Sequence, residues 1–386
     1  MRLLKLSLFF LILLSACRAS PPPPAGDPAR LMTQAVVTVW AAATQTVAAQ
    51  PTATFTPPPP TATPTPPRTP PALPPLYTTS LLNPLDTPHA YIQDTCQYLK
   101  AKWDPNNAAP GTVVMVIMFH SITKGEAANP YQISASEQRM ILRDLKEQGF
   151  EAINIQQLAD FLYRNARIPR RSVVLIVDDR HHAEYFNNHF RPFYEQWGWP
   201  VVNAYIAKDE RPDLWQENAA LAAEGWVDYQ AHGVIHNDPI GPASTEEYMR
   251  GELFGAKANL EKYFHKTPIA YIWPGGGFTP RAVQIARQAG YQLGFTINPR
   301  GPLMFNWVPL ADAPDPNRPA YLAEGPAADP LMTLPRYWDK DARAHLDTVR
   351  RIGNEAAAYA EQHRAAEIEY YNIVCAPTYG PLPQGQ

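Results

Sequence analysis

Two short motifs carry side chains that could together bind a metal ion and move a proton. The first is the pair Asp178-Asp179, which directly follows the apolar run at residues 172–177. The second contains two histidines, His232 and His236, four residues apart. One aspartate and both histidines would supply three ligands to a divalent ion and leave room for water and substrate. The other aspartate would then be free to act as a base.

Neither motif is specific alone, because an aspartate pair often just ends a strand and two spaced histidines often lie on a surface. Their setting makes them stronger. Residues 172–177 form a continuous run rich in β-branched residues, which is typical of a buried parallel strand. Carboxylates at the C-terminal end of such a strand lie where α/β folds place their active sites. The spacing of His232 and His236 would let both side chains project from one side of a helical turn.

Segments of strand and helix character alternate along most of the chain. The predicted strands are residues 112–118, 152–155, 172–177, 201–206, 227–230, 269–273 and 293–297. The predicted helices are residues 134–148, 156–164, 182–197, 215–224, 245–264 and 279–289. This alternation predicts an α/β fold with a parallel sheet, closed into a distorted (β/α) barrel.

The first 17 residues have the pattern of a lipoprotein signal peptide. Arg2 and Lys5 precede an apolar run at residues 6–14, which is too short to span a bilayer. The run ends in Leu-Ser-Ala-Cys17, which resembles a bacterial lipobox. An ordinary secretory signal with a chance cysteine is the alternative. We expect an extracytoplasmic protein held at the membrane through a lipid on Cys17.

Composition divides the remainder. Residues 18–84 are rich in Pro, Thr and Ala, so we expect an extended, disordered tether. A short leading segment at 85–111, a main domain at 112–338 and a C-terminal helix and tail at 339–386 follow. The formal net charge is −3 and the chain has no basic patch, which argues against nucleic-acid binding. No protein partner is indicated.

Two cysteines remain once Cys17 is assigned to the anchor. Cys96 and Cys375 lie near the two ends of the globular part. Outside the cytoplasm such a pair is expected to form a disulfide, and two buried free thiols are the alternative.

The two motifs, in this order, resemble those of the polysaccharide deacetylase family, the NodB-homology domains, over about residues 112–338. The resemblance implies that Asp178 is the general base and Asp179 a metal ligand. It implies that His232 and His236 are the other ligands of a divalent metal, with zinc as the expected ion.

The family's third motif has its counterpart in Trp273-Pro274-Gly275-Gly276. We expect Trp273 to form a wall for a sugar ring, with a plain core position as the alternative. Pro274 and the glycines would let a substrate approach the backbone closely. An N–H of Gly275 or Gly276 could stabilise an oxyanion. A plain flexible turn is the alternative.

Three positions depart from the family pattern. Arg180 replaces a glycine, Ile272 stands where an arginine normally orients the base, and Arg336 takes the place of a histidine that normally acts as general acid. Asp178 needs a cationic or hydrogen-bonding partner to hold its orientation. We expect Arg336 to reach across the barrel mouth and pair with Asp178, with Arg180 as the rival partner.

His120 follows the predicted strand at 112–118 in the sequence Met-Phe-His. This feature and Trp273-Pro274 resemble the branch of poly-N-acetylglucosamine deacetylases. His120 then becomes the candidate for protonating the leaving amine, and a structural histidine at a strand end is the alternative.

The expected function is metal-dependent removal of N-acetyl groups from a cell-surface or extracellular polysaccharide. Two other functions remain open: a metal- and carbohydrate-binding lipoprotein with impaired catalysis, and a purely structural lipoprotein. Acetate release from N-acetylated glycans distinguishes the enzyme from both.

Overall fold

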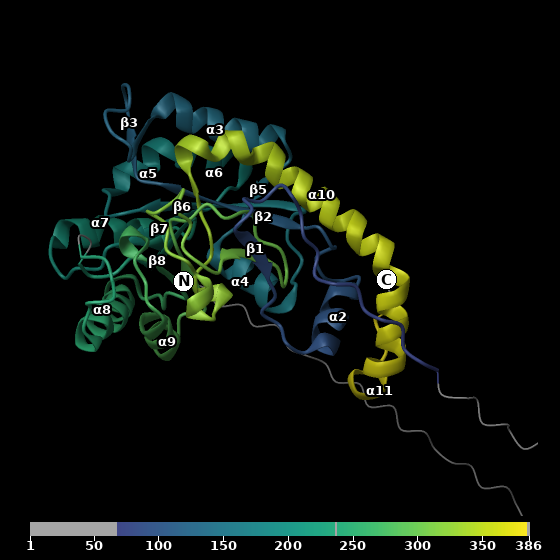
Figure 1. Ribbon diagram of the computed structural model, residues 1–386. Coiled ribbons are helices and arrows are strands. Elements are labelled where there is room, and N and C mark those ends of the chain that lie inside the picture. Colours follow the sequence, from purple (N-terminus) through teal and green to yellow (C-terminus); the bar gives the residue numbers. More distant parts are fainter. Residues whose placement is uncertain (1–67, 236–237, 384–386) are drawn as a thin grey trace, which may run out of the picture. The chain divides into compact units, whose positions relative to one another are not determined.

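A curled sheet of parallel strands lies at the centre of the fold (Figure 1). The computed structural model describes residues 68–235 and 238–383. The strands follow the order β10-β9-β8-β7-β6-β2-β12, and β5 pairs with β6 beside this path. Their bounds are β2 Val113–Phe119, β5 Glu151–Ala152, β6 Arg171–Asp178, β7 Val201–Tyr205, β8 Val227–Ala231, β9 Ala270–Ile272, β10 Leu293–Phe295 and β12 Tyr337–Trp338.

The two ends of this sheet meet through the segment that precedes β12. Leu334 forms a parallel bridge with Phe295 of β10. Its N–H donates to Gly294 O over 2.8 Å, and its carbonyl accepts from Thr296 N over 2.9 Å. Because the same segment continues into β12, which pairs with β2, the sheet closes on itself. The expected distorted (β/α) barrel is confirmed.

Side chains alternate between the inside and the outside of the barrel, as the period of a strand requires. On β6, Val174 and Ile176 pack with the inner cluster, whereas Val173 and Leu175 pack with the outer one. Asp178 continues the inner series at the carboxyl end of the strand. Asp178 is two residues from Ile176 and four from Val174, so its side chain points to the same inner face. Because it ends the strand, it lies at the mouth of the barrel.

Most of the helices surround the barrel and bury their apolar faces against its outer residues (Figure 1). The helices at Thr95–Trp103 and Ala376–Tyr379 instead pack in a separate cluster with Tyr371 and Cys375. Helix α4 differs, because its apolar residues join the inner cluster and it closes the N-terminal end of the barrel. The helices are α2 Thr95–Trp103, α3 Ala135–Glu147, α4 Ile155–Arg164, α5 Ala183–His189, α6 Arg191–Trp197, α7 Pro212–Ala223, α8 Glu246–Phe264, α9 Pro280–Gln288, α10 Asp339–Tyr370 and α11 Ala376–Tyr379.

Some elements differ from the expectations. The single helix expected at 182–197 is two helices, α5 and α6, that meet at Phe190. Pro192 explains the break, because it lacks the N–H that a continuous helix would need there. Two small sheets were not predicted from the sequence. One pairs β1 Asp86–His89 with β11 Val308–Ala311, and the other pairs β3 Ser121–Thr123 with β4 Gln132–Ser134.

The expected tether gives way to packed structure earlier than residue 84. Within residues 68–84, Tyr77 stacks on Trp307 at 5.9 Å between ring centroids, and Trp307 Nε1 donates to Tyr77 O over 2.8 Å. The apolar and aromatic residues at 68–84 pack against the domain, although the segment is also rich in proline. The expected signal peptide with Cys17 and the rest of the expected tether lie outside the described residues. Within the described residues, no helix has the length and apolar character needed to cross a membrane.

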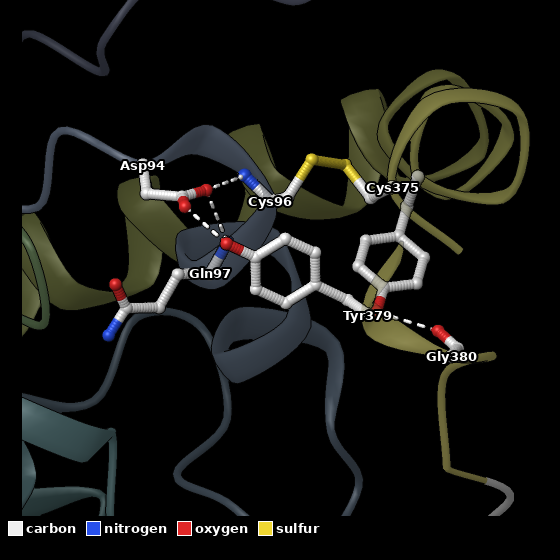
Figure 2. The surroundings of a disulfide bond; sticks show 7 residues. Asp94, Cys96, Gln97, Cys375, Tyr379 and Gly380 are labelled. Carbon is white, nitrogen blue, oxygen red and sulfur yellow. Dashed lines mark hydrogen bonds between the residues drawn. A yellow bond between two sulfur atoms is a disulfide. The ribbon is translucent and has the colours of Figure 1, made fainter. Parts of the chain in front are cut away.

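A disulfide joins Cys96 on α2 to Cys375, with 5.3 Å between their Cα atoms, which confirms the expected bridge (Figure 2). Asp94 caps the same helix by accepting from Cys96 N over 2.8 Å and Gln97 N over 3.0 Å. The Tyr379 hydroxyl donates to the other oxygen of Asp94. The leading segment and the C-terminal tail are therefore tied together covalently and by hydrogen bonds.

Candidate active site

Four polar side chains meet on the inner side of the barrel mouth. Three lie at or just after the carboxyl ends of strands, and the fourth lies just before the short strand β12, which pairs with the carboxyl-terminal part of β2. Asp178 ends β6, His120 follows β2, His232 follows β8, and Arg336 directly precedes β12. Residues this distant in sequence meet because parallel strands end at one edge of a sheet.

Arg336 pairs with Asp178 through two hydrogen bonds, from Nη1 to Oδ1 over 2.6 Å and from Nη2 to Oδ2 over 2.9 Å. Its Nε donates to Thr296 O over 2.7 Å, which fixes the plane of the guanidinium. Only 2% of the Asp178 side chain and 0% of the Arg336 side chain are exposed. The expected pairing is confirmed. Arg180 instead bonds Glu210 over 2.8 Å, so it is no partner of Asp178.

Opposing effects act on the pKa of Asp178. Burial alone would raise it, but the charge of Arg336, and then those of His232 and His120, outweigh burial and hold the pKa below its usual range. The carboxylate is therefore ionised at neutral pH. Its ion pair keeps it in one orientation, as a base at the barrel mouth requires.

Ile272 fills the inside of the barrel and is fully buried, so no side chain from this position reaches Asp178. Its backbone carbonyl has another task, because it accepts a hydrogen bond from His232 Nδ1 over 2.8 Å. A carbonyl can only accept, so the proton lies on Nδ1. Nε2 then keeps its lone pair and faces Asp179 Oδ1 at 3.9 Å.

This donor set fits a divalent metal. A histidine that binds a metal typically donates its other ring N–H to a carbonyl or carboxylate, as His232 does. Burial lowers the pKa of His232 despite the nearby Asp178 and Asp179, so the imidazole is neutral, which ligation requires. Asp179 has a left-handed backbone, with φ 76°, and lies directly after β6.

The third expected ligand, His236, lies outside the described residues. Among residues 68–235 and 238–383, no three His, Cys, Asp or Glu side chains form a group that could hold a metal. The full ligand set therefore stays a prediction. The expected helical turn is wrong for residues 232–235, which form an irregular loop with φ 71° at Gly233. The loop leaves β8 at its end, where strand geometry still sets the direction of His232.

His120 lies against Asp178, with 3.7 Å between its Nε2 and Asp178 Oδ2. Its ring stacks on Trp338 at 5.4 Å between centroids and an interplanar angle of 10°. Its backbone carbonyl accepts from the Tyr185 hydroxyl over 2.8 Å. Trp338 therefore holds one face of the His120 ring at the barrel mouth, while 14% of the His120 side chain remains exposed to solvent. Its role as an acid stays a prediction.

The third motif is less exposed than expected. Trp273 is fully buried and its Nε1 donates to Met332 O over 2.8 Å, so the interpretation of Trp273 as a wall for a sugar ring is wrong. Side-chain alternation places this indole on the outer face of the barrel, among the helices. Pro274 is buried, and Gly276 N donates to Trp273 O over 2.9 Å. Gly275 is exposed and remains the candidate for contact with substrate.

Sequence reasoning missed three residues around the site: Trp338, Tyr185 and Glu252. Trp338 could have been found, because it follows Arg336 by two residues in one extended segment. Glu252 also left a signal, because it interrupts the apolar face that Met249, Leu253 and Ala256 form on α8. Its carboxylate binds backbone of the loop after His232.

Part of the chain is similar to known deacetylases. Residues 165–294 match the family model of polysaccharide deacetylases. The comparison with curated proteins gives no match. The deacetylase PplD of Streptococcus pyogenes is 19% identical, with 62% of this chain and 98% of that chain covered and a TM-score of 0.49. IcaB from Ammonifex degensii is 16% identical, with 62% and 97% covered and a TM-score of 0.47.

These structural similarities have TM-scores below 0.5, so the assignment rests on the family model and on the motifs. The matched segment contains Asp178, Asp179, His232 and His236, the residues of both motifs. The segment at residues 165–294, which carries both motifs, is thus similar to the polysaccharide deacetylase family, and the barrel closes around the same site.

Proposed function

We propose that this protein removes N-acetyl groups from a cell-surface or extracellular polysaccharide in a metal-dependent reaction, as in the poly-N-acetylglucosamine branch of the family. One observation carries the proposal: the buried, bidentate pair of Asp178 and Arg336 at the barrel mouth. Arg336 restores from another strand the cationic partner that Ile272 cannot provide. The departures from the family motif thus leave a supported base.

Asp178 takes the proton of the attacking water. Its two oxygens are held by Arg336, but each carboxylate oxygen has a second lone pair that can accept. The low pKa of Asp178 keeps it ready to accept at neutral pH, although it makes the carboxylate a weaker base. Orientation compensates in part, since a fixed base near the water needs no reorganisation.

A divalent ion, with zinc as the expected metal, would be held by Asp179, His232 and His236, and would polarise the acetyl carbonyl and make the water more acidic. Asp179 and His232 already face one another at 3.9 Å. The Ile272 carbonyl keeps His232 in the tautomer that exposes Nε2 to that position.

His120 protonates the leaving amine. It lies beside Asp178 at 3.7 Å and is partly exposed, so a substrate at the mouth can reach it. The stacked Trp338 indole limits rotation of the ring. Acid and base then come from neighbouring strands, β2 and β6.

The test is acetate release by the purified protein from chitin oligomers, β-1,6-linked N-acetylglucosamine and peptidoglycan. We expect release from at least one substrate, and a loss of about 100-fold or more in Asp178→Asn, because a general base contributes on the order of 10²–10⁴-fold. Asp347→Asn, at an exposed position on α10, is the matched control and should keep full activity. A wild-type protein that binds metal and glycan but releases no acetate would contradict the proposal and support a binding lipoprotein.

The location at a membrane is also a proposal, since Cys17 lies outside the described residues. We infer a lipid anchor from the lipobox pattern in the sequence. Cys17→Ser should move the protein from the membrane fraction to the soluble one. Retention at the membrane in that variant would argue against the anchor.

A further inference from the structure

Glu252 is a buried carboxylate to which the proposed reaction gives no direct task. It lies on α8 with 3% of its surface exposed, between the apolar residues Met249 and Leu253. Burial of an ionisable side chain on the packed face of a helix is costly unless the group finds strong partners. The contacts of its two oxygens therefore show what it stabilises.

Both oxygens bind the backbone of the loop that follows His232. Oε2 accepts from Val234 N over 2.7 Å and from Ile235 N over 3.0 Å, and Oε1 accepts from Ile235 N over 3.1 Å. These N–H groups leave the sheet after β8, so strand pairing does not satisfy them. A carboxylate that accepts two successive N–H groups forms charge-assisted hydrogen bonds, which are stronger than neutral ones.

Gly233 makes this approach possible. A Cβ at this position would lie 2.6 Å from Glu252 Oε2, 3.1 Å from Pro274 Cγ and 3.2 Å from Tyr271 Oη. Its φ of 71° is also in the region that favours glycine. The carboxylate thus occupies the space that a side chain at 233 would need, directly beside the metal-facing His232.

The helix that carries Glu252 is firmly held. Tyr291 donates to the backbone carbonyl of Leu253 over 2.9 Å, and Asn259 on the same helix donates to Ala207 O over 2.8 Å. Leu253 and Leu260 are buried against the barrel. Because α8 is held in place, the Glu252 side chain fixes the position of the loop relative to this helix.

We propose that Glu252 is a positioning residue for the metal site: it fixes the backbone that leads from His232 toward the second histidine of the motif, so that the ligands are arranged before an ion binds. The inference rests on the proposed metal-dependent function. Loops that carry ligands lose affinity when left unsupported, because binding must then also order the loop. Partners outside the ligand shell typically contribute about 10–100-fold in metal affinity.

The test compares Glu252→Gln with the control Leu260→Ala. The glutamine keeps the size of the side chain but loses the charge and one acceptor. The control creates a cavity on the same helix without touching the loop. Three quantities are measured for each: the zinc dissociation constant by competition with a chromophoric chelator, amide hydrogen exchange of the metal-free protein at Val234 and Ile235, and the melting temperature.

For Glu252→Gln we expect a zinc dissociation constant raised by about 10–100-fold and exchange at the two amides faster by about tenfold or more. Leu260→Ala should lower the melting temperature and change the other two quantities by less than about threefold. Faster exchange with unchanged zinc affinity would overturn the proposal, since Glu252 would then serve stability alone, and so would equal losses of affinity in both variants. A wild-type protein that binds no zinc would overturn the proposed function as well, whereas unchanged affinity in Glu252→Gln of a zinc-binding protein overturns only this inference.

Discussion

Replacing Arg336 by methionine removes the cation but keeps an apolar side chain of similar length inside the barrel. Asp178 would then be a buried carboxylate without its bidentate partner. Breaking a buried ion pair from one side typically costs about 3–5 kcal/mol, because the remaining charge is not compensated. In the variant, Asp178 can take up a proton, which removes its charge and limits this cost.

The free-energy cost of protonating Asp178 depends on pH, and it sets the upper limit of the destabilisation. Protonating a carboxyl group of ordinary pKa, about 3.9, costs about 1.4 kcal/mol per pH unit above that value, hence about 4 kcal/mol at pH 7 and about 1.5 kcal/mol at pH 5. In the wild type the folded pKa of Asp178 lies below its usual range, so its stabilising contribution is complete above the unfolded pKa and disappears only as the pH falls below it. Between pH 5 and 7 the pH dependence of the difference therefore comes from the variant.

The assay is urea unfolding of the metal-free proteins at pH 5, 6 and 7. Arg336→Met should be destabilised by up to about 4 kcal/mol at pH 7, and by about 1.4 kcal/mol less for each unit toward pH 5. The double variant Asp178→Asn with Arg336→Met carries no buried charge at these positions and should recover most of the loss, without this pH dependence. A destabilisation that is independent of pH, or an equally unstable double variant, would refute the reasoning.

Two further predictions concern stability. Burial raises the pKa of Asp339 to about 7, so the folded chain keeps this proton where the unfolded chain has released it, and stability falls as the pH rises from about 4 to 7. Asp339→Asn should remove that loss, worth at most about 4 kcal/mol at pH 8, and a pH-stability profile parallel to wild type would contradict it. The Cys96–Cys375 bridge closes a separation of 279 residues. Replacing both cysteines by serine should lower the free energy of unfolding by about 4 kcal/mol, and unfolding that is unchanged by the replacement would show that the bridge contributes nothing.

Much of the site could be predicted from the sequence because it depends on strand ends. Asp178 and Asp179 follow a run rich in β-branched residues, and His232 follows another strand, so local patterns alone place them at one edge of a parallel sheet. The sequence also showed Ile272 at the position where the family pattern has an arginine, and the resulting need for a cation elsewhere pointed to Arg336.

Other features could not be predicted, because they depend on which face of an element is covered. Trp273 follows a strand as His232 does, but the alternation turns its indole outward under the helices, where Met332 takes its N–H. The break of the helix at Phe190 and the packing of Tyr77 on Trp307 likewise depend on neighbours distant in sequence.

The sequence by itself determined the barrel class, the order of the motifs and the residue types that could bind a metal, since these follow from the periodicity and spacing of side chains along the chain. The tertiary structure decided between Arg336 and Arg180 as the partner of Asp178. Only the tertiary structure showed that the Ile272 carbonyl binds His232 and that Glu252 binds the loop after it. Each of these contacts joins elements between 17 and 158 residues apart. Closure of the sheet and packing of α8 bring them together, and neither leaves a local pattern in the chain.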